Sequence, residues 1–224
     1  MIEIPDGATA RKPIPIILLV DVSYSMEPVG IQQANNGIRD YIEELQSNED
    51  TRDSVFISVI TFSDIAETII EHQPIGSIDI PQIEVGAGYT NLDAGLAEVL
   101  ALVERNKNEL KKGKEPLFVF ITDGNPNCSE QAWKDQLQLM NENPLIGTRP
   151  SGRVAGIRVI AGAGDDINDS VLTAFYHKGR EKSHIVRLKD QATISGFFKN
   201  LRTLTVEISE KRPISEIPGT QLVN

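Results

Sequence analysis

The chain has 224 residues, of which 40% are hydrophobic, enough to fill the core of one globular domain. Its formal net charge of −10 argues against nucleic acid or an anionic membrane as the main partner, because those surfaces attract clustered Lys and Arg. The lone Cys128 excludes an internal disulfide, the N-terminal sequence MIEIPDGATARKPIP lacks the features of a signal peptide, and no apolar run is long enough to span a membrane. We therefore expect a cytoplasmic protein.

The first half of the chain alternates strand and helix patterns. A continuous apolar run predicts a buried strand over Ile14–Val20, and the spacing of apolar residues predicts a helix over Gln32–Leu45. The segments Ser54–Phe62 and Ala66–Glu71 follow each other so closely that they predict a hairpin, which makes the second an antiparallel edge strand. Gln73–Gly88, rich in Gly and Pro, is expected to be a long connection.

The second half continues the alternation. The predicted helices are Leu92–Val103, Glu130–Met140, a short one near Asn168–Phe175, and Gln191–Leu204. The predicted strands are Pro116–Thr122, Val154–Ala161 and Ser183–Leu188, and the segment Asn141–Arg153 is expected to be irregular.

This order of elements predicts an α/β fold. Strands that alternate with helices imply a Rossmann-like, doubly wound, mainly parallel sheet with one antiparallel edge strand and helices on both faces. Residues 13–208 are expected to form the domain. Residues 1–12 and 209–224 are expected to be flexible tails, because they lack hydrophobic periodicity.

Polar side chains follow two of the apolar strands. Asp21, Ser23 and Ser25 come directly after the first strand in LLVDVSYSM, and Asp123 follows the fourth strand in FVFITDG. Between them, GAGYTNLD places Thr90 after a glycine turn. Ligands of doubly wound sheets bind beyond the carboxyl ends of the strands. If the first and fourth strands are neighbours, these five side chains meet in one crevice.

Two carboxylates in one crevice need protonation, distance or a cation, and a hard divalent cation is the simplest answer. At about 4 Å, with an effective dielectric near 20, they repel each other by roughly 4 kcal/mol. Hydroxyl and carboxylate oxygens are ligands that Mg²⁺ prefers, with Mn²⁺ or Ca²⁺ as alternatives. The three His residues show no ligand-like spacing, which argues against zinc.

The motifs DVSYS and TDG, with Thr90 between them, resemble the metal-ion-dependent adhesion site (MIDAS) of von Willebrand factor A (vWA) domains, and the resemblance covers residues 14 to about 205. It implies Ser23, Ser25 and Thr90 as direct metal ligands, and Asp21 and Asp123 as supporting acids that often act through water. The chain is also similar to stand-alone bacterial proteins of the tellurium-resistance TerY type. That similarity implies a role in a bacterial stress or defence complex.

Two tyrosines depart from the family pattern. Tyr24 and Tyr89 stand where many vWA domains have glycine, so both place bulk beside the expected cation. Aromatic side chains on loops near a site serve as partner contacts, and inward packing is the alternative. The sequence leaves both open.

Several residues near the crevice also have purely structural interpretations. In TNLD, Thr90 could cap the following helix while Asp93 reaches back to it. Asp165 and Asp166 should face the crevice, yet helix capping is the favoured role for them. Cys128, just beyond the TDG turn, is expected to be inert.

The ligand set predicts binding and not catalysis. Neutral hydroxyl ligands leave residual positive charge on a cation, which should attract an Asp or Glu of a protein partner. We expect a metal-dependent protein-binding module and no enzyme, because no positioned base, phosphate-gripping Lys or P-loop is recognisable. Two alternatives remain: a metal-dependent phosphohydrolase that uses Asp21, and a scaffold whose cation only tethers loops.

Overall fold

The structure is a computed structural model that describes residues 12–26, 31–80, 82–86, 88–164, 167–176 and 183–210. Within these residues, six strands form one sheet in the order β3-β2-β1-β4-β5-β6. Their bounds are β1 Ile14–Asp21, β2 Val55–Phe62, β3 Ala66–Pro74, β4 Leu117–Thr122, β5 Ile157–Ala163 and β6 Ser183–Leu188. All neighbours are parallel except β2 and β3, which form the predicted antiparallel hairpin at one edge.

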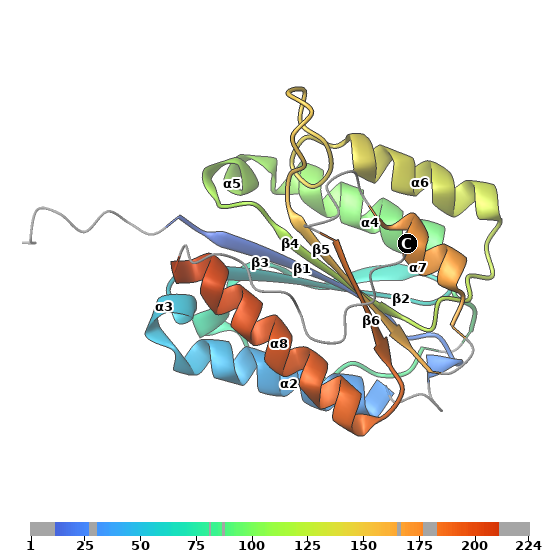
Figure 1. The fold of residues 1–224 in the computed structure, drawn as a ribbon, viewed down its shortest axis with the longest axis horizontal. Coiled ribbons are helices and arrows are strands. Elements are labelled where there is room, and N and C mark those ends of the chain that lie inside the picture. Colours follow the sequence, from blue (N-terminus) through green and yellow to red (C-terminus); the bar gives the residue numbers. More distant parts are fainter. Residues whose placement is uncertain are drawn as a thin grey trace, which may run out of the picture.

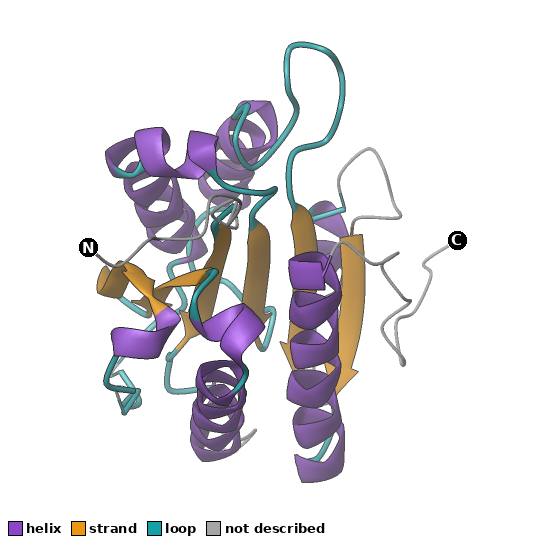
Figure 2. Cartoon of the chain, turned by 90° about the vertical axis from the view of Figure 1, so that its left-hand side faces the viewer, coloured by secondary structure: helices purple, strands orange, loops and turns teal. Residues whose placement is uncertain are grey.

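Helices cover both faces of this sheet (Figures 1 and 2). The described helices are α2 Ile31–Ser47, α3 Glu49–Arg52, the 3-10 helix η1 Ile75–Ser77, α4 Leu92–Arg105, α5 Lys107–Lys112, α6 Glu130–Glu142, α7 Asp169–Ala174 and α8 Gln191–Glu210. One buried cluster joins the sheet to α2 and α8, and a second joins it to α4, α6 and α7. The predicted fold class is confirmed.

The composition of β1 follows from its central place in the sheet. All eight of its residues are buried, since β2 and β4 flank it and both faces are covered. Ile16 and Leu18 pack into the core under α2 and α8, whereas Ile17 and Leu19 pack into the core under α4 and α6. A strand buried on both faces reads as a continuous apolar run, which is the pattern that predicted it.

Several predicted boundaries differ from the structure. The helices α3 and α5 were not predicted, because four and six residues are too few for a visible period. Strand β3 continues past the predicted end at Glu71 to Pro74. Strand β5 begins at Ile157 and not at Val154, because Gly156 turns the chain with a φ of +88°.

The predicted domain end at residue 208 falls inside α8, which continues to Glu210. Residues 1–11 and 211–224 of the predicted tails lie outside the described residues, as do Asp165 and Asp166. The side chain that caps α7 is that of Asn168, which accepts a hydrogen bond from the Ser170 N–H.

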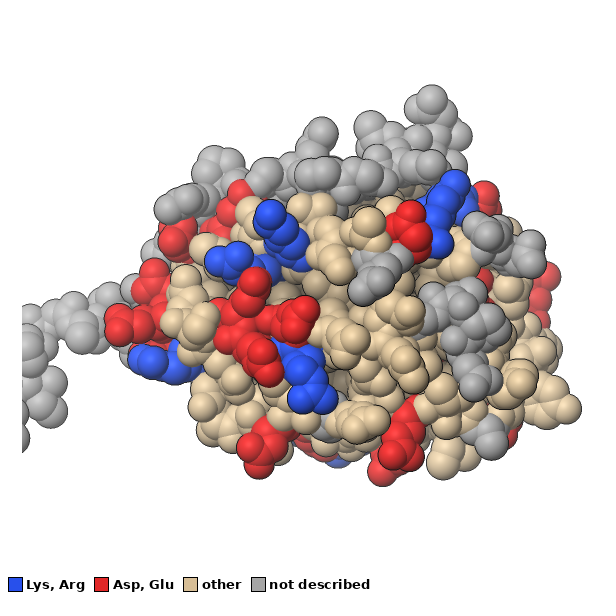
Figure 3. Space-filling view, turned by 90° about the horizontal axis from the view of Figure 1, so that it is seen from below, with Lys and Arg blue, Asp and Glu red and all other residues tan. Residues whose placement is uncertain are grey.

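On the face covered by α2 and α8, Lys and Arg lie beside Asp and Glu and form no broad basic patch (Figure 3). No described helix is long and apolar enough to cross a membrane.

Candidate metal centre

The two acids of the predicted site lie at neighbouring strand ends. Asp21 is the last residue of β1, and Asp123 follows directly after β4. Strands β1 and β4 are parallel neighbours, with Val20 opposite Ile121. Their carboxyl ends therefore bring Asp21 and Asp123 to the same edge of the sheet, as the sequence predicted.

The chain turns sharply after Asp21 and so brings two hydroxyls together. The Ser23 N–H donates to Asp21 Oδ1 at 2.9 Å, and the Met26 N–H donates to the Ser23 carbonyl at 3.0 Å. In this turn Ser23 Oγ lies 3.0 Å from Ser25 Oγ. Oxygen ligands held at about 2.0–2.1 Å by an octahedral Mg²⁺ are themselves about 2.9 Å apart, so this pair suits one small cation.

Asp21 is a fully buried carboxyl in a network of donors. Thr122 Oγ1 donates to Asp21 Oδ2 at 2.7 Å and in turn accepts from the Gly124 N–H at 3.0 Å. Burial raises the pKa of Asp21 to about 6; hydrogen bonds from Ser23 and Thr122 act against this rise, and the nearby Asp123 carboxylate adds to it. No described Lys or Arg takes part, so a cation would supply the charge that the ionised carboxylate lacks.

Asp123 lies in a tight turn. It is 6% exposed, and its Oδ1 accepts the Asn125 N–H at 3.1 Å. The next residue, Gly124, has a φ of +79°, which is a conformation that favours glycine. This explains the glycine of the TDG motif.

Thr90 is held between the other two loops. Its N–H donates to Asn127 Oδ1 at 2.8 Å, and the Asn127 N–H donates back to the Thr90 carbonyl at 2.9 Å. On the other side, the Tyr24 N–H donates to the Gly88 carbonyl at 3.4 Å. The segment of Thr90 thus lies between the turn that carries Asp21, Ser23 and Ser25 and the turn that carries Asp123.

The alternative role of Thr90 as a helix cap is wrong. The N-cap of α4 is Asn91, and no side chain makes a capping hydrogen bond there. Thr90 is 2% exposed, and its hydroxyl donates to no other described residue. Because Asn127 fixes its backbone, the hydroxyl is left for another ligand.

Sequence reasoning missed three side chains that support the site. Thr122 orients Asp21, and Asn127 anchors Thr90. Asp64 accepts the Tyr89 N–H at 2.9 Å and lies so close to Gly88 that no Cβ would fit there. Thr122 could have been predicted, because it belongs to the TDG motif. The contacts of Asn127 and Asp64 could not, because they join segments that are distant in the sequence.

The two tyrosines point outward. Tyr24 is 65% exposed and Tyr89 is 67% exposed, so the inward-packing alternative is wrong. Cys128 is half-buried, and burial raises the pKa of its thiol, which agrees with an inert cysteine.

A metal at this edge would need the hydroxyls as ligands. Nowhere in the described ranges do three His, Cys, Asp or Glu side chains gather in a group that could hold a metal. Two acids with three hydroxyls form a hard, oxygen-only donor set, which suits Mg²⁺, Mn²⁺ or Ca²⁺.

Comparison with known proteins places this chain in a family. The family model of the von Willebrand factor type A domain matches residues 16–200. The chain belongs to this family. A search by sequence among curated proteins found no match.

Solved structures share this vWA fold at low identity. The pilus adhesin SpaC of Lactobacillus rhamnosus GG, in its open conformation, is 15% identical, with a TM-score of 0.60 over 89% of this chain and 30% of that one. Manganese-loaded TRAP of Plasmodium vivax is 19% identical, with a TM-score of 0.57 over 79% of this chain and 69% of that one. A von Willebrand factor type A protein of Catenulispora acidiphila is 13% identical, with a TM-score of 0.59 over 87% of this chain and 43% of that one. The chain thus spans less than a third of the adhesin. Sequence identities this low support a shared fold and no shared function.

Proposed function

We propose that this vWA domain is a protein-binding module that engages an Asp or Glu of its partner through a divalent cation. Ser23, Ser25 and Thr90 would hold the cation directly, and Asp21 and Asp123 would support it through water. Magnesium is the proposed ion, and manganese or calcium suits the same oxygen ligands. Tyr24 and Tyr89, which are exposed beside the site, would contact the partner.

One observation carries the proposal. The hydroxyls of Ser23 and Ser25 lie 3.0 Å apart beside Asp21, a buried carboxyl that has no cationic partner among the described residues. The manganese-loaded vWA relative and the vWA-containing pilus adhesin support a metal and an adhesive role by analogy. A cytoplasmic stress-response complex of the tellurium-resistance type belongs to the proposal on the strength of the sequence resemblance.

The buried position of Asp21 favours binding over catalysis. A phosphohydrolase of the Asp-x-Asp kind needs an aspartate that can reach a phosphorus atom, and Asp21 is 0% exposed with both oxygens accepting hydrogen bonds. Ser23 occupies the position of the second acid in such enzymes. We therefore propose a non-enzymatic role.

The test is capture of partners from native lysate by the immobilised protein, in magnesium and in EDTA. We expect at least one protein to be retained in magnesium and to be lost both in EDTA and with a Ser23→Ala/Ser25→Ala variant. A Ser195→Ala variant, which removes an exposed hydroxyl from α8, serves as the matched control and should retain the partner.

Two results would redirect the proposal. Metal that raises the melting temperature without any metal-dependent partner would favour the scaffold alternative. Manganese-dependent release of phosphate from generic phosphoesters, abolished by Asp21→Asn, would favour the phosphohydrolase.

A further inference from the structure

A groove lies directly behind the turn that carries the predicted metal ligands. It has a volume of about 380 Å³ and runs between the β2–β3 hairpin and the segment 82–86. Val22, which stands between Asp21 and Ser23, forms part of its floor, and the Val22 carbonyl accepts the Gly86 N–H at 2.7 Å. The groove and the candidate metal site therefore share one loop.

The groove combines polar side chains with apolar ones that are open to solvent. Ile65 is 72% exposed and Val85 is 37% exposed, and these are two of the five large hydrophobic side chains that stand out on the described surface. Ile69 lies two strand positions beyond Glu67 and so faces the same side of the sheet. Exposed apolar side chains that line a groove mark a place where another molecule binds.

Two carboxylates line the same groove from opposite sides. Glu67 comes from β3, where it pairs in register with Thr61, and Glu84 comes from the segment 82–86. Both are exposed, and within the described residues neither carboxylate has an ion pair or a hydrogen bond. A purely apolar occupant would desolvate these charges without compensation, and an acidic occupant would be repelled.

We propose that this groove binds a Lys or Arg side chain of the same partner segment that presents its acid to the metal. The aliphatic stem would lie on Ile65 and Val85, and the cationic head would pair with Glu67 and Glu84. This inference rests on the proposed function, since it assigns a second contact to the same partner. It predicts a recognition element that contains one acidic and one basic residue at a fixed spacing.

A random-sequence peptide library selected on the immobilised 224-residue chain in saturating magnesium tests the proposal. We expect enriched peptides to share an Asp or Glu and, at a constant distance from it, a Lys or Arg. Binding of a selected peptide should weaken at least about tenfold with Glu67→Lys/Glu84→Lys. The control Asp40→Lys/Glu43→Lys adds the same charge on the exposed side of α2 and should leave binding unchanged.

The outcomes distinguish failure of the groove proposal from failure of the proposed metal-dependent binding. Peptides that share the acid but no basic residue, or that bind the Glu67→Lys/Glu84→Lys variant as well as wild type, overturn the groove assignment and leave the metal proposal standing. Peptides that share a basic residue and bind equally in EDTA support the groove and contradict the metal proposal. A library that yields no enrichment overturns both. A Glu67→Gln/Glu84→Gln variant repeats the test without charge reversal, and circular dichroism verifies that each variant is folded.

Discussion

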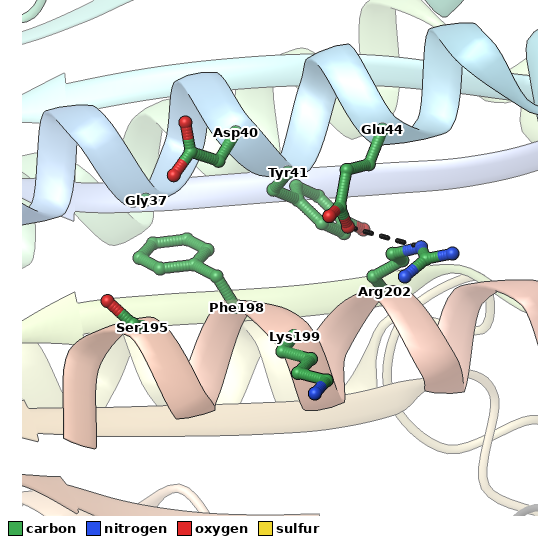
Figure 4. Close-up of a pocket in the computed structure, with 8 residues that line it drawn as sticks. All are labelled: Gly37, Asp40, Tyr41, Glu44, Ser195, Phe198, Lys199 and Arg202. Atoms are coloured by element: carbon green, nitrogen blue, oxygen red, sulfur yellow. Dashed lines mark ion pairs between the residues drawn. The ribbon is translucent and has the colours of Figure 1, made fainter. Parts of the chain in front are cut away.

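The groove between α2 and α8 and the crevice at the carboxyl ends of β1 and β4 both contain hydroxyl and carboxylate side chains. In the groove, which has a volume of about 270 Å³, Glu44 Oε2 lies 3.1 Å from Arg202 Nε (Figure 4). The Tyr41 hydroxyl is 2.8 Å from Thr205 Oγ1. Three of its polar side chains, those of Tyr41, Glu44 and Arg202, are therefore already paired.

The crevice differs because its two carboxylates accept hydrogen bonds but have no cationic partner among the described residues. Asp21 is buried with a raised pKa and stands next to a second carboxylate, and the Thr90 hydroxyl donates to no described residue. The groove thus pairs its Glu44 carboxylate with Arg202, whereas the strand-end crevice leaves two carboxylates without a counter-charge and the Thr90 hydroxyl available to a ligand. The mark of the candidate site is therefore a pair of buried carboxylates without a counter-charge among the described residues.

The largest expected effect is a loss of stability that leaves metal binding unchanged. Phe198 packs on Gly37 with no room for a Cβ between them, and its ring is 3% exposed. Phe198→Ala should lower the free energy of unfolding by about 3–5 kcal/mol, because it removes a buried ring between two helices. Urea denaturation measures this change. Magnesium affinity measured by calorimetry should not change, and a parallel loss of affinity would show that the two regions are coupled.

The next effect concerns pH and Asp21. Its pKa in the folded protein is about 6, above the ordinary value of 3.8, so the folded state binds more protons than the unfolded state between these values. In metal-free protein, Asp21 should therefore add stability, on the order of 3 kcal/mol, as the pH falls from about 7 to about 4.

Asp21→Asn should remove this contribution. Subtracting the stability of the variant from that of wild type at each pH cancels the effect of the other titrating groups. In excess magnesium, the wild-type protein should instead lose stability as the pH falls, since the cation binds the ionised carboxylate. Thermal unfolding over the pH range, with and without metal, gives both results; identical profiles for the two proteins would contradict the assignment.

An intermediate effect concerns Thr122, which acts through another residue. Thr122→Val keeps the shape of the side chain but removes the hydrogen bond to Asp21 Oδ2. Loss of such a supporting contact should weaken metal binding by about 10- to 100-fold. Titration calorimetry measures it, and an unchanged affinity would mean that Asp21 does not support the cation.

The smallest effect is expected in the groove of α2 and α8. Glu44 and Arg202 have side chains that are 50% and 40% exposed, so solvent screens their ion pair. Glu44→Gln should change the free energy of unfolding by less than about 1 kcal/mol and leave metal binding unaffected. A large loss in thermal unfolding would contradict the view that this pair is a weakly contributing surface contact.

The convergence of the site was predictable because it depends on strand ends. Asp21 and Asp123 each stop a continuous apolar run, and parallel neighbours must present these ends together. The motif DVSYS then located Ser23 and Ser25. Side chains held by long-range contacts were not predictable in the same way: Asn127 and Asp64 are ordinary loop residues until the fold brings them to Thr90 and its neighbours.

The errors in the prediction have local causes. Thr90 followed by Asp93 has the pattern of a capping box, but the pairing with Asn127 holds Thr90 one residue before the actual N-cap. The apolar residues from Val154 onward suggested a strand that began too early, because the left-handed turn at Gly156 cannot be seen in a hydrophobic pattern. The orientation of Tyr24 was undecidable from sequence, since an aromatic side chain in a loop is compatible with either environment.

The central claim is that the hydroxyls beside Asp21 hold a divalent cation, and titration calorimetry with magnesium and manganese tests it most directly. Wild-type protein and the Ser195→Ala control should bind a single ion with the same affinity, and Ser23→Ala/Ser25→Ala should lose that binding while remaining folded. Absence of binding to wild type, or equal binding by the Ser23→Ala/Ser25→Ala variant, would contradict the claim.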